Sequence, residues 1–179
     1  MKSKKAISGV ITAVIMIALV IAATSIVWTI VNNLVKDKLD EAGSCFDTFE
    51  KVTINNKYTC YNITEESSTD PNELRVSISV SDIDLTALLV SVSDSQGNSK
   101  SFKLSNTPIT ENYLRLYNGN YNEDIIIPEK NSGINYVINT QELGIGYPSL
   151  IQLAPIVGGK QCEVSDLLSK IDNCKSLVF

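Results

Sequence analysis

Hydrophobic and polar residues follow two different patterns in this chain, and the change between them lies near residue 43. From Ala6 to Val35 there are 30 consecutive residues without a charged side chain. As an α-helix this run would be about 45 Å long, whereas the hydrocarbon core of a bilayer is about 30 Å thick. The pattern therefore predicts a membrane-spanning helix that is longer than a single span requires.

The helical pattern continues beyond the uncharged run. In the segment VNNLVKDKLDEA the apolar residues lie on one side of a helix and the charged residues lie elsewhere. Gly43 then offers a C-terminal stop. We therefore expect a single helix over residues 7–42, preceded by a basic leader over residues 1–6 and followed by a separate domain over residues 43–179.

The charges that flank the helix predict its orientation. Lys2, Lys4 and Lys5 precede the apolar run, and the positive-inside rule places such residues in the cytoplasm. A secretory signal peptide has an apolar region of only about 7–15 residues, followed by a cleavage site with small residues. Here the run continues well past the sequence ATS at residues 23–25, the one weak candidate for such a site. The helix is therefore predicted to be retained, with the rest of the chain outside the cell.

Small and weakly polar side chains share one face of the predicted helix. They follow one another at steps of four, three, four and three residues: Ala18, Ala22, Ser25, Thr29 and Asn32. Such a stripe allows helices to approach closely in an apolar medium. Ala, Ser and Thr are also ordinary constituents of membrane helices, so the stripe alone has two interpretations. Combined with the excess length of the helix, it favours helix–helix packing.

Beyond residue 43 apolar residues alternate with polar ones, which is typical of half-buried β-strands. The clearest case is Leu74 to Val80, and residues 87–105 form a predicted hairpin around the turn sequence DSQGN. Further strands are predicted at residues 52–63, 125–127, 134–139 and 150–157. Together these segments predict a mostly antiparallel β-sandwich of the immunoglobulin type. With the long helix, the fold class is α+β.

One segment near the C-terminus departs from this alternation. In EVSDLLSKIDNC four apolar residues stand at helical spacing: Val164, Leu167, Leu168 and Ile171. The spacing predicts a short C-terminal helix or turn, flanked by Cys162 and Cys174.

The cysteines indicate an oxidising compartment. They are Cys45, Cys60, Cys162 and Cys174. None forms a CxxC pair, which disfavours a zinc site, whereas two disulfides fit an exported domain. Four cysteines allow three pairings, and proximity along the chain favours two local bridges, Cys45–Cys60 and Cys162–Cys174.

Composition narrows the functional classes. After residue 6 the chain contains 12 basic and 20 acidic residues, a net charge of −8. An acidic surface is unsuited to nucleic acid, whose phosphates need a basic partner. The chain contains no histidine, which is the usual general base and the commonest metal ligand. We therefore expect no catalytic residue, no metal site and no cofactor.

Three weaker signals concern the predicted domain outside the membrane. Asp82 and Asp84 could approach a calcium ion, but an exposed strand end explains them more simply. Asn62 begins the sequence NIT, an acceptor for N-glycosylation. Five tyrosines form either an adhesive surface or, in the favoured interpretation, half-buried strand aromatics: Tyr113, Tyr117, Tyr121, Tyr136 and Tyr147.

The basic leader and the start of the helix form a combined motif, in which KKA at residues 4–6 precedes ISGVI at residues 7–11. This N-terminus resembles that of archaeal type IV pilins, which carry a class III signal peptide. In that family a prepilin peptidase cuts between the leader and the helix on the cytoplasmic side, which places the cut between Ala6 and Ile7. Bacterial pilins carry a glutamate at the position of Ile11, so the resemblance, which covers about the first 40 residues, is to the archaeal branch.

The resemblance implies a structural and adhesive subunit of a surface filament, with the helix in the filament core and the acidic domain outside. It implies as partners further copies of the chain, the prepilin peptidase, an assembly ATPase and a membrane platform protein. Before assembly the protein would lie in the cell membrane with its N-terminus in the cytoplasm, and after assembly it would lie in an extracellular filament.

Two other functional classes remain open. A single-pass membrane protein could bind a ligand with its outer domain and never polymerise. The leader disfavours this class, because an anchor gains nothing from a cut on the cytoplasmic side. A secreted hydrolase is disfavoured by the missing histidine, although paired carboxylates support glycoside chemistry.

Overall fold

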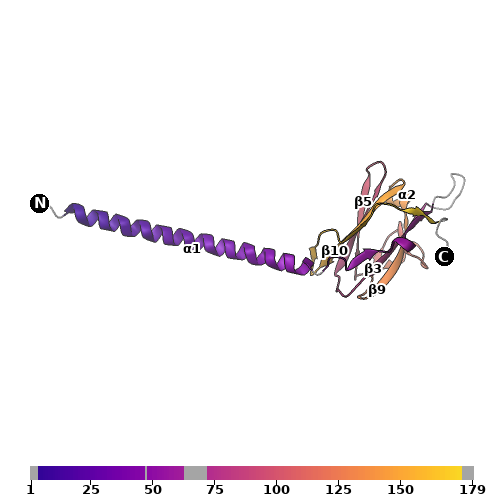
Figure 1. Ribbon diagram of the computed structural model, residues 1–179, viewed down its shortest axis with the longest axis horizontal. Helices are drawn as coiled ribbons and strands as arrows, with labels where there is room; N and C mark the ends of the chain where they lie inside the picture. The colour runs from indigo at the N-terminus through magenta and orange to yellow at the C-terminus, as the bar shows by residue number, and fades with distance from the viewer. Residues whose placement is uncertain (1–3, 47, 63–71, 175–179) are drawn as a thin grey trace. The chain divides into compact units, whose positions relative to one another are not determined.

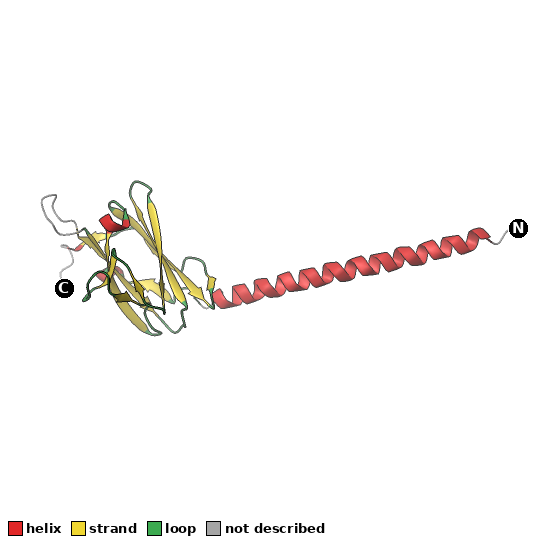
Figure 2. Ribbon diagram, turned by 180° about the vertical axis from the view of Figure 1, so that it is seen from behind, coloured by secondary structure: helices red, strands yellow, loops and turns green. Residues whose placement is uncertain are grey.

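The structure is a computed structural model, and it describes residues 4–46, 48–62 and 72–174 (Figure 1). The chain divides into two compact units, Met1–Gly43 and Ser44–Phe179, the second of which we call the head. The first unit is helical, whereas the head is rich in strands, as the colours of Figure 2 show. The change of pattern in the sequence coincides with this division.

Helix α1 spans Lys4–Phe46 and contains 43 residues. Its sequence has no proline and only two glycines, so nothing in it interrupts the hydrogen bonds from each turn to the next. The helix passes through Gly43, where the sequence predicts a stop, and ends three residues later. Cys45 therefore lies in its last turn.

Six of the described strands form one sheet. The order along it is β13-β2-β3-β9-β7, and β1 also pairs with β3. Every pairing is antiparallel except that of β13 with β2, which is parallel. The strands are β1 (Val52–Ile54), β2 (Cys60–Asn62), β3 (Glu73–Val80), β7 (Leu114–Leu116), β9 (Ser132–Asn139) and β13 (Asp172–Asn173).

A second sheet has five of the described strands, in the order β11-β10-β4-β5, with β12 paired to β10. All of its pairings are antiparallel. The strands are β4 (Ala87–Asp94), β5 (Ser99–Ser105), β10 (Pro148–Val157), β11 (Lys160–Gln161) and β12 (Asp166–Leu168). A small ribbon, β6 (Ile109–Thr110) with β8 (Asp124–Ile125), and the 3₁₀ helix η1 (Asn56–Tyr58) complete the strand-rich part.

Both larger sheets contribute side chains to one hydrophobic core. Alternate residues of β3 are exposed by 3 % or less: Leu74, Val76, Ile78 and Val80. From the other sheet, Val90 in β4 and Leu153 in β10 are equally buried. The alternation predicted from Leu74 to Val80 is therefore confirmed, and β4 and β5 form the predicted hairpin.

The predicted C-terminal helix is wrong, because EVSDLLSKIDNC contributes the short strands β12 and β13 instead. A helix would bury its four apolar residues together, but Leu168 is exposed by only 8 % whereas Leu167 is exposed by 53 %. Neighbouring residues thus face opposite sides, as in a strand. The strand is secured by Asp166, whose Oδ2 accepts a hydrogen bond from the backbone N–H of Ile54 at 2.7 Å.

The short helix of the head lies between β9 and β10. This helix, α2, spans Thr140–Leu143. The side chain of Asn139 accepts hydrogen bonds from two backbone N–H groups of its first turn, and Gly144 ends it in a left-handed conformation with φ 75°. Four residues are too few to produce a helical period in the sequence, so this helix was not predicted.

The two local disulfides predicted from sequence proximity are also wrong. Both bridges join distant parts of the head: Cys45–Cys162 and Cys60–Cys174, with separations of 117 and 114 residues. The second follows from the parallel pairing of β13 with β2, which aligns Asp172 with Cys60. Sequence proximity fails because strand pairing brings the C-terminal segment back to the beginning of the head.

Asp94 joins two loops at the end of β4. Its carboxylate accepts hydrogen bonds from the backbone N–H groups of Gln96 and Asn98, both at 2.9 Å, and from Asn98 Nδ2 at 2.8 Å. The N–H of Gly146, which precedes β10, donates to the same carboxylate at 3.2 Å. These bonds, above all that from the Asn98 side chain, lower the pKa of Asp94 below its usual value of 3.8.

The long-range disulfides lead to a first prediction. Non-reducing peptide mapping should recover linked peptides for Cys45–Cys162 and Cys60–Cys174. Because each bridge closes a loop of more than 100 residues in the unfolded chain, the double variant Cys45→Ser, Cys162→Ser should lose about 2–5 kcal/mol of unfolding free energy. Chemical denaturation of the variant measures this loss. Local linkages, or four thiols that alkylate without reductant, would contradict the fold.

Asp94 leads to a second prediction, which depends on pH. A lowered pKa in the folded state means that the carboxylate stabilises the fold above pH 3.8, and that this contribution is lost as pH falls through the lowered value. Asp94→Asn should therefore lower the melting temperature by about 4 °C at pH 7 and by clearly less near pH 2.5. Asp172→Asn, which changes an exposed carboxyl in β13, is the control. An equal loss at both pH values would contradict the assignment.

Candidate functional site

The most unusual surface of the protein is that of the apolar segment of α1. The segment Gly9–Lys36 has 28 residues and a mean hydropathy of 2.8, and none of it is buried by other parts of the chain. The large apolar side chains between Val10 and Val35 are exposed by 44–68 %. By length and composition this helix can cross a membrane. Its surface needs lipid or other protein around it, because water does not solvate it favourably.

One face of α1 is narrow and carries the small side chains. At 100° per residue, Ala18, Ala22, Ser25 and Thr29 fall within a sector of about 60°. The hydroxyl of Ser25 donates to the carbonyl oxygen of Ile21 at 2.8 Å, and that of Thr29 donates to the carbonyl oxygen of Ser25 at 3.0 Å. Both donors are thus satisfied within the helix, so this face can lie against an apolar neighbour without an unpaired polar group.

The opposite face of α1 is broad and bulky. We call the residues Val27, Ile30, Val31 and Leu34 the bulky face; they lie within about 100° of one another and are centred opposite the small-residue stripe. Their exposed fractions range from 44 % to 59 %. The helix therefore offers two apolar faces of different shape, one suited to close backbone approach and one suited to larger partners.

The last turn of α1 is held by the head. Cys45 forms its disulfide with Cys162, which follows β11. The carbonyl oxygen of Cys45 accepts hydrogen bonds from the backbone N–H of Thr48 at 3.1 Å and from its hydroxyl at 2.7 Å. Cys162 in turn donates its N–H to the carbonyl oxygen of Pro155 in β10 at 2.8 Å. The end of the helix is thus joined to the head by a disulfide as well as by the chain.

The aspartates considered for a calcium site lie beside a lysine. Lys130 Nζ is 2.8 Å from Asp82 Oδ1 and 3.9 Å from Asp84 Oδ2. The hydrogen bond from Lys130 lowers the pKa of Asp82, and the same bond raises the pKa of Lys130. An ammonium group thus already balances these carboxylates. Among the described residues no group of three or more potential metal-ligating side chains is found.

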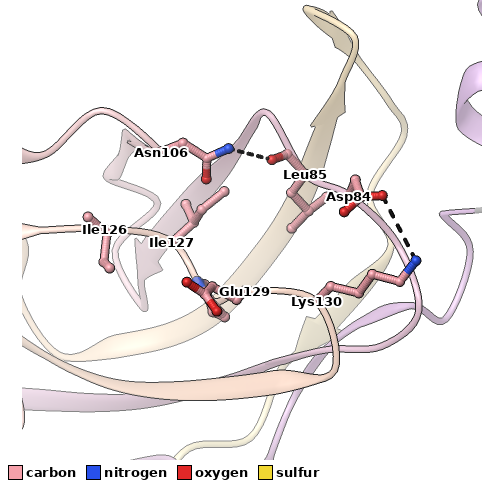
Figure 3. Close-up of a pocket in the computed structure, with 8 residues that line it drawn as sticks. Asp84, Leu85, Asn106, Ile126, Ile127, Glu129 and Lys130 are labelled. Carbon is pink, nitrogen blue, oxygen red and sulfur yellow. Dashed lines mark hydrogen bonds and ion pairs between the residues drawn. The ribbon is translucent and has the colours of Figure 1, made fainter.

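A shallow cleft adjoins this lysine (Figure 3). Its volume is about 450 Å³, and it is lined by Leu85, Ile126 and Ile127 with a polar rim that includes Lys130. Asn106 is part of the wall of the cleft, where its Nδ2 donates a hydrogen bond to the carbonyl oxygen of Leu85 at 3.0 Å. The cleft contains no arrangement of nucleophile and base, so we assign no chemistry to it.

The five tyrosines have different surroundings. Tyr136 is exposed by only 1 %, its hydroxyl donates to the carbonyl oxygen of Ile126 at 2.6 Å, and burial raises its pKa. Tyr113 and Tyr121 are half-buried but lie outside the strands, so of the five only Tyr136, in β9, is a strand aromatic. Tyr117 and Tyr147, in contrast, are exposed by 48 % and 46 %. Strand aromatics therefore account for part of the set only.

One polar cluster was not predicted from the sequence. Arg115 Nη2 pairs with Glu73 Oε1 at 2.9 Å, and the hydroxyl of Tyr121 donates to the same oxygen at 3.1 Å. Arg115 Nη1 also donates to the carbonyl oxygens of Tyr117 and Gly119 at 3.0 and 3.2 Å. The guanidinium thus binds backbone carbonyl groups of the loop after β7. Since Glu73 and Arg115 are 42 residues apart, no local pattern reveals the pair.

The residues predicted for modification are described only in part. The backbone of Ala6 and Ile7 belongs to α1, but their side chains lie outside the described part of the structure. Asn62 is the half-buried last residue of β2 and pairs with Glu73. The rest of its acceptor sequence lies outside the described residues. Leader cleavage and glycosylation therefore stay predictions.

Comparison with known proteins adds no relative, since no family model matches the chain and no curated protein matches it. The two units differ in their physical properties. One unit has an apolar segment, Gly9–Lys36, that is not buried within the chain, and the other is a head closed by two long-range disulfides.

Proposed function

We propose that the protein is a pilin, a structural subunit of an archaeal type IV pilus-like surface filament. In this proposal α1 forms the filament core, and the head forms the outer, adhesive surface. The chain is not an enzyme and needs no cofactor for this function. Its N-terminus lies in the cytoplasm while the precursor waits in the cell membrane.

The observation that carries the proposal is the exposed apolar length of α1. Its 28-residue apolar segment extends about 42 Å, so about 12 Å of it lies beyond a hydrocarbon core of about 30 Å. In a plain anchor this surplus places apolar side chains in water. In a bundle of such helices the surplus is buried, which makes assembly favourable.

The small-residue stripe supports the same conclusion. Helices in an apolar medium associate by close packing and not by the hydrophobic effect, so small side chains on one face promote contact. In α1 the hydroxyls of Ser25 and Thr29 are already satisfied by the helix itself. A neighbouring helix therefore meets no unpaired donor on this face.

We assign the head to the filament exterior. We further assign its fold to the immunoglobulin type of β-sandwich. Two larger sheets that share one core support this assignment. Two disulfides suit an oxidising exterior, and the acidic composition suits a surface in contact with water. Partners in this proposal are other copies of the chain, a prepilin peptidase, an assembly ATPase and a membrane platform protein.

The alternative is a single-pass membrane protein that binds a ligand with its head and does not polymerise. The cleft beside Lys130 is the feature that favours it, since clefts of this volume are common sites for small ligands. The two functions differ in what they require of α1, because an anchor needs only hydrophobicity whereas a filament core needs specific packing.

The basic leader generates a third prediction. If a prepilin peptidase processes the chain, protein extracted from the cell surface should begin at Ile7, with the N-terminal sequence ISGVITAV. Edman sequencing or intact mass spectrometry makes this measurement. A chain that still begins at Met1, or one that begins near Ile26, would show that the leader is not processed in this way.

The small-residue stripe generates a fourth prediction. Ala22→Leu adds bulk where backbones approach closely, and overpacking of this kind costs about 1–3 kcal/mol at each contact. The segment stays at least as hydrophobic, so membrane insertion should persist. We expect the variant to accumulate in the membrane while surface filaments, counted by electron microscopy, fall sharply.

The matched control is Ile21→Leu, which roughly conserves volume next to the stripe. It should assemble nearly as well as the wild type, because isosteric apolar exchanges are well tolerated. Filaments of Ala22→Leu at wild-type abundance would mean that the stripe is only membrane-helix composition, and the anchored ligand-binding protein would then be preferred.

A further inference from the structure

The outer face of the six-stranded sheet carries the two arginines of the chain. In β3 the buried residues alternate with residues that point away from the core, among them Glu73 and Arg75. Val137 of β9 pairs with Arg75 of β3 on one side and with Arg115 of β7 on the other (Figure 1). Directly opposed residues share a face of a sheet, so both arginines flank Val137, which is exposed by 0 %.

Arg115 belongs to a complete group of cation, aromatic ring and carboxylate. Its Cζ lies 5.3 Å from the ring centroid of Tyr121, and its Nη2 pairs with Glu73 Oε1 at 2.9 Å. The hydroxyl of Tyr121 donates to the same carboxylate oxygen. The guanidinium thus has both of its preferred contacts, a carboxylate in its plane and an aromatic ring on its face.

Arg75 repeats this arrangement without the carboxylate. Its Cζ lies 5.2 Å from the ring centroid of Tyr117. Over positions 44–179 the head has 17 acidic and 10 basic residues, yet none of the described carboxylates pairs with Arg75. Its Nε is buried and has no hydrogen-bond partner in the described part of the structure, whereas its two Nη groups are not buried. The charged end of Arg75 is therefore accessible to an anion from outside the chain.

Two further side chains adjoin this guanidinium. Tyr117 follows β7 and is exposed by 48 %, and its backbone N–H donates to the carbonyl oxygen of Asn135 in β9 at 2.9 Å. This bond places the two residues opposite each other, and Tyr117 faces outward as Arg115 does two residues earlier. Asn135 is exposed, and no hydrogen bond of its side chain is found among the described residues. We call Arg75, Tyr117 and Asn135 the arginine site.

The surface beside Asn135 is flat. Gly133, two residues earlier in β9, is exposed and pairs with Ser79 of β3. Since it has no side chain, it leaves space on the outer face, where a Cβ would lie 3.2 Å from Ser79 Oγ. An extended ligand can therefore continue past the arginine site along the sheet.

The three side chains of the arginine site define the chemistry of a ligand. The Nη groups of Arg75 suit a carboxylate, which accepts two parallel hydrogen bonds in the plane of a guanidinium. The exposed ring of Tyr117 offers an apolar face to the C–H groups of a sugar ring. The amide of Asn135 both donates and accepts, as sugar hydroxyls require. An aspartate or glutamate side chain would use the guanidinium but neither of the other two groups.

The local charge admits an acidic ligand although the head as a whole is acidic. Glu73 is neutralised by Arg115. Asp172 of β13 lies in the same row as Arg75, with Cys60 of β2 between them, and so is two strand spacings, or about 10 Å, away. Exposed charges more than about 8 Å apart are largely screened at physiological ionic strength. The unpaired charge at the site is thus that of Arg75.

We propose that the arginine site binds a carboxylated sugar, of the uronic acid class, within an acidic polysaccharide. Arg75 binds the carboxylate, Tyr117 packs against the sugar ring and Asn135 contacts its hydroxyls. This inference rests on the proposed adhesive function of the head and names the class of its ligand.

Isothermal titration calorimetry of the full chain in lipid nanodiscs, at about 0.15 M salt, tests the site. The probe is a short oligogalacturonate. One comparison ligand is its methyl ester, which keeps the sugar and loses the charge, and the other is a sulfated glucose oligomer of equal length. We expect the oligogalacturonate to bind at least about tenfold more tightly than either. No binding, or equal binding of either comparison ligand, would overturn the proposal.

Substitutions assign the binding to the named side chains. Arg75→Gln should weaken it about tenfold, and Arg75→Lys should weaken it similarly, because lysine keeps the charge but lacks the planar fork. Tyr117→Leu should weaken binding while the melting temperature of the head stays unchanged. The matched control is Lys103→Gln, which removes an exposed cation from β5 of the other sheet and should bind as the wild type does. Equal losses in Lys103→Gln and Arg75→Gln would mean attraction by overall charge and would refute the site.

Filament counts separate this proposal from the proposed function. Calorimetry needs no filament, so the absence of filaments from wild-type cells would refute the proposed function and leave the binding result intact. Loss of filaments from Arg75→Gln with unchanged sugar binding would show that Arg75 meets a carboxylate of a neighbouring copy, and would overturn the sugar site alone.

Discussion

The exposed apolar length of α1 is the physical constraint on which the rest of the structure depends. Its 28-residue segment Gly9–Lys36, which is mostly apolar, is not buried within the chain, so the isolated protein is incomplete in water. A bilayer covers about 20 of these residues and leaves the last turns, around Ile30 and Leu34, uncovered. Phe46 and Phe49, at and just after the end of α1, are exposed as well, by 85 % and 69 %. The single chain thus has two kinds of exposed apolar surface.

The head, in contrast, is stabilised by contacts within its own chain. Its core is built from alternate residues of two sheets, and both disulfides join its beginning to its end. In the unfolded chain such long loops restrict conformational freedom more than local bridges would. The carboxylate of Asp94 adds hydrogen bonds to the β4–β5 turn and to Gly146, which precedes β10. The head is therefore stabilised by long-range links that do not depend on a partner.

The features predicted from the sequence are those with a local period. Uninterrupted apolar residues predicted α1, and the alternation from Leu74 to Val80 predicted β3, because both patterns follow directly from backbone geometry. The disulfide pairing was not predictable, since Cys60 meets Cys174 only through the parallel pairing of β13 with β2. Leu167 and Leu168 illustrate the limit for short segments, because four apolar residues at helical spacing do not suffice to form a helix where strand pairing competes. In the candidate site the stripe was visible in the sequence, whereas the exposure of Phe46 was not.

The disulfide between Cys45 and Cys162 also determines how the protein bears mechanical load. It closes a covalent ring that contains most of the head, so tension between α1 and any residue of that ring is shared by two stretches of chain. For an attachment near Leu150, the shorter stretch runs back to Cys162 over about 12 residues, or about 40 Å when extended. Without the bridge, the same pull could unravel about 105 residues. A head loaded at its later strands is thus connected to α1 by two stretches of chain, one of them short.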